Sequence, residues 1–452
     1  MGGEKSKNCT FRKMIIQTLS REEIIEKYLK LEKELEKVRK EKEALEKELH
    51  KYKNPNTPPS AHPHLKQVAA FTRSKKRGAP KGHKGVTRQK KETPYYRHIV
   101  GKECPRCLSK SFEVIGQKSQ QQEELPPEIQ PETTNIARDI CQCNDCHLKF
   151  LARDNQTPLQ GKFGINLMVL IIFLKFIVRG VLRKTTSFLD ASFALKLAPA
   201  SVQAIIERAA QAGEKEYSAL KQKIKSARLL YIDETSFRVL GKNWWVWAFR
   251  SDTDLLLVIR NSRGNNVLDE ILGKNYAGIV VCDCWRAYDF LVNAVLQRCW
   301  AHLLRKSKEL DSLVGKHFHK KLTALFDEVK KFNGKERTEK QRIRKYTEMT
   351  LKLQKIIDYY SQYQECKAVT KYIDFHLESW FTCIKFAGVQ PTNNYAEQAI
   401  RETVLVRKII GAFRSENGTK TYETLASLIA TWQYQKLDIK KELSRMLSAN
   451  LC

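Results

Sequence analysis

The amino-acid sequence predicts a multidomain α/β protein, in which helical and cysteine-containing segments precede a mixed α/β core. Three observations support this prediction. The chain of 452 residues is long enough for roughly two to four structural units with at least one buried core. Heptad-spaced apolar residues near the N-terminus predict a long helix. Apolar runs typical of strands begin only at Leu229. The order of these patterns separates a helical region from an α/β region.

The charge balance indicates a polyanionic partner. The chain has 81 Lys and Arg against 50 Asp and Glu, a formal net charge of +31, and a basic surface binds phosphates by releasing their counterions. Residues 51–91 contain twelve Lys or Arg and no Asp or Glu. A generally basic, soluble protein is the alternative, but this uneven distribution counts against it.

The sequence predicts a cytoplasmic protein without a membrane segment. The N-terminus is polar and lacks the apolar region of a signal peptide. The most apolar stretch, Ile165 to Val178, has about 14 residues, which is too short to span a bilayer and suits a buried helix. Five of the twelve cysteines fall between Cys104 and Cys146. That clustering indicates metal binding in a reducing compartment rather than a disulfide scaffold.

The N-terminal segment has the pattern of a coiled coil. Its seam positions alternate spacings of four and three, and Glu and Lys fill nearly everything between them. Lys42 interrupts the seam, as a polar residue that sets register or partner does. The alternative is a single amphipathic helix packed on its own domain. We expect a homodimer or higher oligomer, because little other apolar surface is available to cover the seam residues Ile24, Tyr28, Leu31, Leu35, Val38, Leu45 and Leu49.

A basic segment follows the helix, which the prolines between Asn54 and Ser60 end. Glycines in Lys75–Gly85 would let the backbone lie close to phosphates, and an arm of this kind can follow a DNA groove. A solvated flexible linker is the alternative. The candidate DNA-binding residues are Lys75, Lys76, Arg77, Lys81 and Lys84.

Two CxxC pairs predict a zinc-binding module. Cys104 and Cys107 are separated from Cys143 and Cys146 by 35 residues, and four thiolates can close a tetrahedral Zn²⁺ site that stabilises a small region. Cys141 or His147 could replace one ligand, and ordinary buried thiols are the alternative. A Zn²⁺ ion held by four protein ligands would be structural, since no position stays open for catalysis.

The segment between residues 161 and 225 is expected to be helical and contains a possible helix-turn-helix. Arg183–Phe193 and Ala200–Ala210 would be its helices, with Pro199 in the first turn of the second. A plain helical hairpin has the same pattern and is an equally good interpretation. In the first interpretation, the residues that face DNA are Ser201, Gln203 and Arg208.

From Leu229 the pattern predicts three strands, a helix around Val267–Leu272 and a fourth strand ending at Asp283. This order is typical of a ribonuclease-H-like fold. The first and fourth strands lie side by side in that topology. Asp233 and Asp283 would then be neighbours despite 49 intervening residues.

Three acidic residues are candidates for metal-dependent chemistry on nucleic acid. Asp233 and Asp283 each end an apolar run, and Glu397 lies one turn into a predicted helix. Strand-end carboxylates beside apolar runs are costly unless solvated or coordinated. Mg²⁺ prefers carboxylate oxygen, and two Mg²⁺ ions roughly 3.5–4 Å apart can activate an attacking hydroxyl and stabilise a leaving oxygen. Asp233 would be the ligand that both Mg²⁺ ions share.

Glu397 also has alternative interpretations. It falls three residues after Asn394 and could complete a helix capping box, and Arg401, four residues further on, could pair with it. Glu234 should point away from Asp233, because side chains alternate along a strand. His302 and Arg401 are weaker candidates for contacts with DNA or the transition state.

In its ordered motifs, the chain resembles the DDE transposases of the insertion-sequence-66 family. The heptad helix, the Asn- and Pro-rich segment, the basic Gly-His-Lys-Gly stretch and the cysteine pairs come first. The core motifs follow, and they are Asp233-Glu234-Thr235, Asp283 with Ala287-Tyr288, Cys299-Trp300-Ala301-His302 with Arg305-Lys306, Asn393-Asn394-Tyr395-Ala396-Glu397, Arg407-Lys408 and Gly418. This resemblance covers essentially the whole chain.

The resemblance implies that Asp233, Asp283 and Glu397 are the catalytic triad. It also implies a DNA transposase that uses Mg²⁺ or Mn²⁺ to cleave and join strands, with terminal inverted repeats and target DNA as its double-stranded partners in a nucleoid-associated location. A DNA-binding regulator with inactive carboxylates is the alternative. Two departures from the family pattern bear on the site: Asp283-Cys284-Trp285 replaces Asp-Gly-Tyr, and Pro391-Thr392 stands where an Asp is usual.

The predicted organisation has seven segments. They are a coiled-coil helix (1–53), a basic Pro/Gly linker (54–98), a zinc-binding module (99–155), a helical region with a possible helix-turn-helix (156–226), the first part of a ribonuclease-H-like core (227–302), a helical insertion (303–388) and the second part of the core with the Glu397 helix (389–452).

Overall fold

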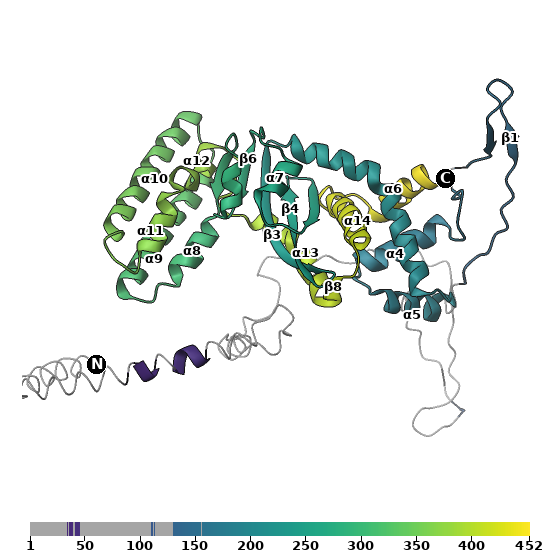
Figure 1. Cartoon of the computed structure of the whole chain (residues 1–452), viewed down its shortest axis with the longest axis horizontal. Coiled ribbons are helices and arrows are strands. Elements are labelled where there is room, and N and C mark those ends of the chain that lie inside the picture. Colours follow the sequence, from purple (N-terminus) through teal and green to yellow (C-terminus); the bar gives the residue numbers. More distant parts are fainter. Residues whose placement is uncertain are drawn as a thin grey trace, which may run out of the picture. The chain divides into compact units, whose positions relative to one another are not determined.

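The computed structural model describes residues 34, 36–38, 41–45, 110, 111, 113, 130–154 and 156–452. The chain divides into two compact units, Met1–Leu125 and Pro126–Cys452, and Figure 1 shows the elements of the second. Among the helices of the described ranges, none is long and apolar enough to cross a membrane. The predicted DNA-binding residues of the basic segment, Lys75, Lys76, Arg77, Lys81 and Lys84, lie outside the described residues, as do Cys104 and Cys107.

The first unit contributes only a few described residues to the predicted coiled coil. Residues 34, 36–38 and 41–45 are helical, which agrees with the heptad pattern, and the seam residues Val38 and Leu45 are 62% and 65% exposed. Most seam positions lie outside the described residues. Self-association through this helix therefore stays a prediction.

The second unit is built around a mixed sheet. Its strand order is β5-β4-β3-β6-β7, and β8 pairs with the end of β3. The β3–β4 and β4–β5 pairs are antiparallel, whereas β3–β6 and β6–β7 are parallel. This topology is compatible with a ribonuclease-H-like core, and the predicted adjacency of the first and fourth core strands is confirmed. The strands are β3 (Leu229–Val239), β4 (Lys242–Arg250), β5 (Leu255–Arg260), β6 (Ile279–Cys282), β7 (Val295–Arg298) and β8 (Ala412–Phe413).

The first hairpin of the sheet follows from its turn residues. Leu240 and Gly241 have φ values of 51° and 76°, and two consecutive positive φ angles produce the tight turn whose twist matches antiparallel strands. The strands that this turn joins, β3 and β4, carry the largest buried side chains of the sheet, including Phe237, Trp247 and Phe249. Trp247 is thus a core residue, as predicted, rather than a stacking platform for bases.

Helices α4 to α6 pack beside the sheet in the region predicted to be helical. They are α4 (Ile165–Phe176), α5 (Leu182–Phe193) and α6 (Pro199–Lys225). The apolar α4 is a buried helix, as predicted, and Pro199 is in the first turn of α6. Helix α6 is longer than the expected second helix of a helix-turn-helix, because its apolar face continues past Ala210 through Tyr217 and Leu220 to Ile224.

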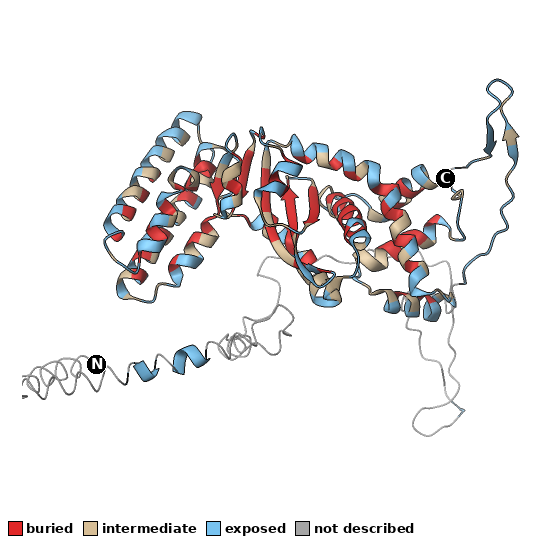
Figure 2. Ribbon diagram, in the orientation of Figure 1, coloured by how far each residue is buried: buried red, intermediate tan, exposed pale blue. Residues whose placement is uncertain are grey.

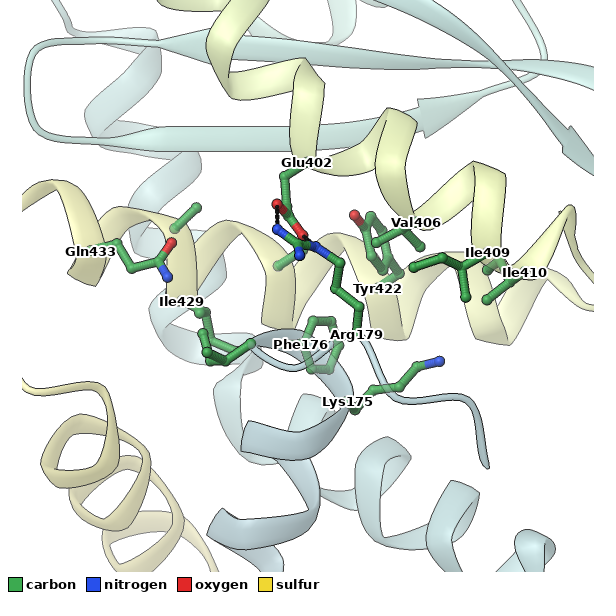
Figure 3. Close-up of a pocket in the computed structure, with 13 residues that line it drawn as sticks. Lys175, Phe176, Arg179, Glu402, Val406, Ile409, Ile410, Tyr422, Ile429 and Gln433 are labelled. Atoms are coloured by element: carbon green, nitrogen blue, oxygen red, sulfur yellow. Dashed lines mark hydrogen bonds and ion pairs between the residues drawn. The ribbon is translucent and has the colours of Figure 1, made fainter. Parts of the chain in front are cut away.

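The side chain of Arg179 links this helical region to the core. Arg179 has a φ of 60° just after α4, and its guanidinium donates to both oxygens of Glu402, at 2.5 and 2.8 Å. A cavity of about 110 Å³ lies beside this ion pair and is lined by Lys175, Phe176 and apolar residues of the last helices (Figure 3). Both charged side chains are more than a third exposed.

A helical bundle is inserted between β7 and the C-terminal helices, as predicted. Its apolar core around Trp300, Phe318 and Trp380 continues onto strands β3 and β6 of the sheet, and Figure 2 shows the buried faces of its helices turned toward one another. A capping box formed by Thr338 and Gln341 begins its longest helix. The elements are α8 (Trp300–Lys308), α9 (Leu313–Asn333), α10 (Glu339–Tyr360), α11 (Lys367–Asp374), η3 (Leu377–Trp380) and α12 (Thr382–Lys385).

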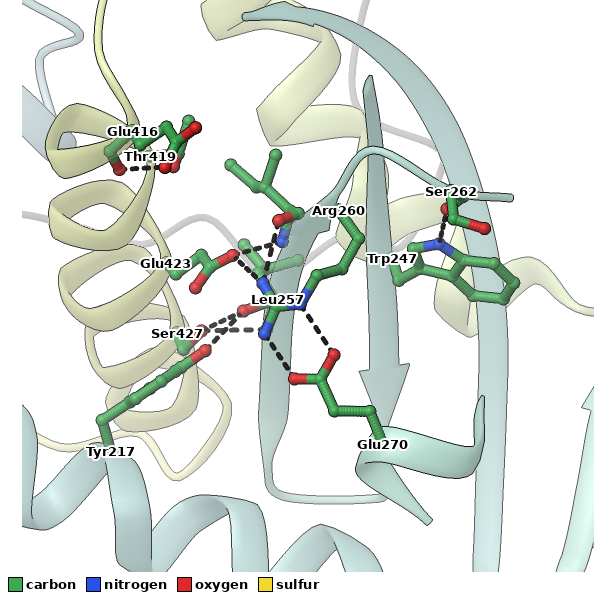
Figure 4. A network of polar contacts seen from close by, with 11 residues as sticks. Tyr217, Trp247, Leu257, Arg260, Ser262, Glu270, Glu416, Thr419, Glu423 and Ser427 are labelled. Atoms are coloured by element: carbon green, nitrogen blue, oxygen red, sulfur yellow. Dashed lines mark hydrogen bonds and ion pairs between the residues drawn. The ribbon is translucent and has the colours of Figure 1, made fainter. Parts of the chain in front are cut away.

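The last helices return to the sheet. Side chains of α14 accept hydrogen bonds from the edge strand β5: Ser427 Oγ from Leu257 N at 2.9 Å, Thr431 Oγ1 from Leu255 N at 3.0 Å, and Glu423 from Ile259 N. Figure 4 shows the part of this network around Glu423 and Ser427 from close by. The remaining elements are β1 (Ile140–Gln142), β2 (Lys149–Leu151), α7 (Asn265–Ile271), η2 (Arg286–Phe290), α13 (Asn394–Ile410), α14 (Glu416–Tyr434) and α15 (Ile439–Leu451).

Candidate active site

Asp233 lies within β3, not at its end as the sequence suggested. β3 runs on to Val239 because it pairs with β4 along its whole length, whereas its pairing with β6 stops at Tyr231. The carboxyl group of Asp233 is therefore placed where the parallel part of the sheet opens. Burial raises the pKa of Asp233 to about 8, and the charges of Glu234, Asp283 and Glu397 add to this rise.

Asp283 is the first residue after β6, in agreement with the sequence prediction. Its Oδ1 accepts a hydrogen bond from Trp285 N at 2.9 Å. The buried Arg298 fixes the backbone at this point, because its Nη1 donates to Asp283 O at 2.6 Å. The first contact orients the carboxylate, and the second fixes the backbone that carries it.

Glu397 lies in the first turn of α13, and the capping-box interpretation is wrong. The helix begins with Asn393 as its N-cap, without a side-chain capping bond. Glu397 N donates to Asn393 O at 3.0 Å, but Glu397 Oε1 is buried and has no hydrogen-bond partner within the described ranges. The basic side chain beside the Glu397 carboxylate is His302 rather than Arg401, with 3.9 Å between His302 Nδ1 and Glu397 Oε1.

Asn393 is a site residue that the sequence did not single out. It is fully buried, and its Nδ2 donates to Ile232 O at 2.7 Å, one residue before Asp233. Its backbone N donates to Cys299 Sγ at 3.2 Å. Asn393 thereby ties the start of the Glu397 helix to the strand that carries Asp233. The paired asparagines at the start of this helix were the available signal.

Glu234, which the sequence predicted to point away from Asp233, has partners of its own that explain its burial. Its carboxylate accepts from Tyr288 Oη at 2.6 Å and from Arg263 Nε at 2.8 Å. The Arg263 guanidinium also lies over the rings of Trp245 and Trp285. Burial raises the pKa of Glu234, while Tyr288 and Arg263 oppose that rise. Glu234 is a structural carboxylate.

The three predicted acids lie near enough for their charges to interact, and their chemistry fits a divalent cation. Burial is the main cause of the raised pKa of Asp233, and the charges of Asp283 and Glu397 add to it. Carboxylate oxygens are the ligands that Mg²⁺ and Mn²⁺ prefer. Glu397 Oε1 and Asn393 Oδ1 are buried and lack a hydrogen-bond partner among the described residues. Buried polar atoms usually have such a partner, and a bound cation would supply it.

One half of the predicted zinc module lies on the β1–β2 hairpin. Cys143 N donates to Leu148 O at 3.0 Å and His147 N to Cys143 O at 3.1 Å, and His147 has a φ of 57°. Hydrogen bonds from the backbone of Cys146 and Asp145, together with the Cys146 side chain, lower the pKa of the Cys143 thiol. This turn favours thiolate ligands, although Cys104 and Cys107 lie outside the described residues.

The three candidate readers of DNA lie on α6. Ser201, Gln203 and Arg208 are half-buried, and Gln203 Nε2 donates to Glu207 Oε1 at 2.9 Å. The helix pair around them is present. Their contact with DNA stays a prediction.

Comparison with known proteins identifies the family. The model of the IS66 family of transposases matches residues 160–421, more than half of the 452-residue chain. The matched segment includes Asp233, Asp283 and Glu397. No curated protein matches the chain. The chain therefore belongs to the IS66 transposase family, as its ordered motifs predicted.

Proposed function

We propose that this protein is an active DNA transposase, which binds the ends of an insertion sequence, cleaves the strands there and joins them to target DNA. The observation that carries the proposal is the convergence of Asp233, Asp283 and Glu397 in a chain of this family. Asp233 with a pKa near 8 is costly to ionise without a cation. A carboxyl group in this state is typical of a functional site.

The three acids would hold divalent cations, Mg²⁺ or Mn²⁺. Bound there, such cations supply Lewis-acid stabilisation of a phosphoryl oxygen and an activated hydroxyl nucleophile. Asp233 offers its carboxylate from the rigid middle of β3, and Arg298 orients Asp283 through the backbone. Asn393 fixes the distance between β3 and the Glu397 helix. These residues preorganise the acids, which lowers the reorganisation needed during reaction.

The remaining predicted parts would bind and organise DNA. Lys75, Lys76, Arg77, Lys81 and Lys84 are proposed to contact phosphates, and α5 with α6 to read the terminal inverted repeats. A structural Zn²⁺ would be held by Cys104, Cys107, Cys143 and Cys146. The heptad helix would form a homodimer or higher oligomer, which brings two DNA ends together. The action on DNA implies a nucleoid-associated location.

A strand-joining assay with the full chain, end-containing duplex DNA and Mg²⁺ tests this function. Asp233→Asn, Asp283→Asn and Glu397→Gln keep side-chain size but remove a charged ligand. Each should lower joining by at least about 10²–10³-fold, the scale for losing one preorganised electrostatic contact. Asp252→Asn, an exposed carboxylate in the β4–β5 turn, is the matched control and should join normally.

The alternative, a DNA-binding regulator with inactive carboxylates, predicts a different result. The wild-type chain would then bind end-containing DNA specifically, and no Mg²⁺- or Mn²⁺-dependent cleavage would be detected. Joining that survived all three triad substitutions would contradict the assignment of these residues as catalytic.

A further inference from the structure

A second group of possible metal ligands includes Glu397. Cys299, His302 and Glu397 each bring one ligand atom to within 4.8 Å of the other two, and His302 Nδ1 lies 3.9 Å from Glu397 Oε1. Cys299 is the N-cap of α8 and His302 lies in its first turn, so a spacing of three brings both to one side of the helix. Helix α13 supplies Glu397. Three donor atoms of different chemistry, sulfur, nitrogen and oxygen, therefore surround one point.

Two of these three donor atoms lack a partner. His302 Nδ1 and Glu397 Oε1 are buried and accept or donate no hydrogen bond in the part of the chain that the structure describes. The 3.9 Å between them is too long for a direct hydrogen bond. Cys299 Sγ accepts a hydrogen bond from Asn393 N, at 3.2 Å, and backbone hydrogen bonds from His302 and Ala301 also reach it. Unpartnered buried atoms that face one another indicate a missing ligand between them.

We propose that Cys299, His302 and Glu397 form a binding site for a transition metal of the Zn²⁺ class. Thiolate, imidazole and carboxylate are Zn²⁺ ligands, whereas Mg²⁺ disfavours sulfur and nitrogen. Tetrahedral Zn²⁺ ligands lie roughly 3.3–3.8 Å apart, as follows from bond lengths of about 2.0–2.3 Å. Small side-chain movements would close the present arrangement onto an ion.

The charges of such a site balance. The Cys299 S–H bond breaks as the metal–sulfur bond forms, and the proton goes to solvent. One thiolate and one carboxylate then neutralise the divalent ion, while neutral His302 adds no charge. Three protein ligands leave a fourth coordination position open to water.

This site would compete with the catalytic use of Glu397, an inference that rests on the proposed function. A carboxylate oxygen bound to Zn²⁺ beside Cys299 and His302 is withdrawn from the cation shared with Asp233 and Asp283. Zn²⁺ should therefore inhibit joining that Mg²⁺ supports, and a chelator should reverse the inhibition.

Cobalt absorption of the full chain tests the site independently of activity. Co²⁺ bound to a thiolate gives a sulfur-to-metal charge-transfer band. Wild-type protein, Cys299→Ser and His302→Ala are compared, so that cobalt held by Cys143 and Cys146 cancels in the difference. Cys366→Ser, which removes a buried thiol in the helical insertion, controls for general destabilisation.

We expect one fewer bound Co²⁺ in Cys299→Ser and in His302→Ala, and no change in Cys366→Ser. Equal cobalt binding by all four proteins would overturn the proposal.

Zinc inhibition of strand joining tests the competition. At fixed Mg²⁺, the half-inhibitory Zn²⁺ concentration is measured relative to the zinc-free rate of each protein. It should rise at least about tenfold in Cys299→Ser, the usual scale for a weakened metal site, and stay at the wild-type value in Cys366→Ser. A wild-type chain that joins no DNA would refute the proposed function, while the cobalt experiment still decides on the metal site. Normal joining with identical zinc sensitivity in both variants would refute the competition alone.

Discussion

Two places in the same sheet differ in how their buried polar groups are paired. At the β5 edge, Glu423, Ser427 and Thr431 of α14 accept hydrogen bonds from Ile259, Leu257 and Leu255 in turn. Four helical residues rise about 6 Å and two strand residues about 6.6–6.8 Å. Side chains four apart on the helix therefore match alternate backbone groups of the strand. The helix satisfies an edge that would otherwise be open to pairing with another chain.

At the opening beside β6, buried polar atoms stay unpaired. Glu397 Oε1, Asn393 Oδ1 and His302 Nδ1 have no hydrogen-bond partner among the described residues, and Asp233 has a strongly raised pKa. The comparison teaches that pairing marks a structural role in this fold. The unpaired oxygens of Glu397 and Asn393 lie where we propose that a cation binds.

The largest expected loss of stability follows removal of Glu423. Glu423→Ala leaves Ile259 N without its acceptor and removes one of the two carboxylates that bind Arg260, at 2.7 Å. The free energy of unfolding should fall by about 2–4 kcal/mol, since Arg260 keeps Glu270. Chemical denaturation measures this change. Lys420→Ala, exposed on the same helix, should stay within about 0.5 kcal/mol of wild type. If Glu423→Ala left the free energy of unfolding unchanged, the contrast between the β5 edge and the opening beside β6 would not hold.

In metal-free protein, substitution of Asp233 is expected to raise the free energy of unfolding rather than lower it. Its folded pKa of about 8 exceeds its ordinary value, so the stability from its protonated form is complete below about pH 4 and is lost as the pH rises to about 8. Asp233→Asn should therefore raise the free energy of unfolding above pH 8 by several kcal/mol, although we expect it to lower joining.

Thermal melts in a chelator between pH 5 and 9 check this expectation. The wild-type melting temperature should fall more steeply with pH than that of Asp233→Asn, and added Mg²⁺ should reduce the difference. Asp252→Asn serves as the exposed control. If both substitutions gave the same pH profile, Asp233 would not carry the strain that we assign to it.

A smaller effect is expected at Ser427. Ser427→Ala removes the acceptor of Leu257 N but leaves Tyr217 Oη donating to Leu257 O at 3.0 Å. The free energy of unfolding should fall by about 1–2 kcal/mol. Hydrogen exchange of the Leu257 amide should accelerate more than that of amides in the middle of the sheet. Uniform acceleration would indicate a general loss of stability rather than an opened edge.

The smallest effect is expected at the exposed ion pair between Arg179 and Glu402. Both side chains are more than a third exposed, and such pairs contribute about 0.2–1 kcal/mol. Arg179→Ala should lower stability by no more than this amount, and 1 M salt should abolish the difference. A larger, salt-insensitive loss would point instead to the backbone of Arg179, which has a positive φ.

Local patterns predicted much of the core. The apolar run from Leu229 to Val239 coincides with β3, and Pro199 marks the start of α6. The order of strands was sufficient to place Asp283 near Asp233, because few topologies bring such strands into one sheet. The expectation that Asp233 lies at the end of a strand was wrong, since β3 continues past it in its pairing with β4.

Contacts between distant segments could not be predicted in the same way. Asn393 and Ile232 are 161 residues apart, and α14 meets β5 across more than 160 residues. The spacing of residues along the chain does not reveal such pairs. The His302–Glu397 contact is of the same kind, and it makes His302 a candidate metal ligand beside Glu397.

The sequence by itself determined the family, the strand order and the three acidic residues that we propose to be catalytic, because these depend on residue type and local pattern. The tertiary structure decided which polar atoms are satisfied and which are left unpaired. Hydrogen-bond partners and burial come from elements far apart in the chain, and they alone separate Glu423, which holds the sheet edge, from Glu397, which lacks a partner within the described residues.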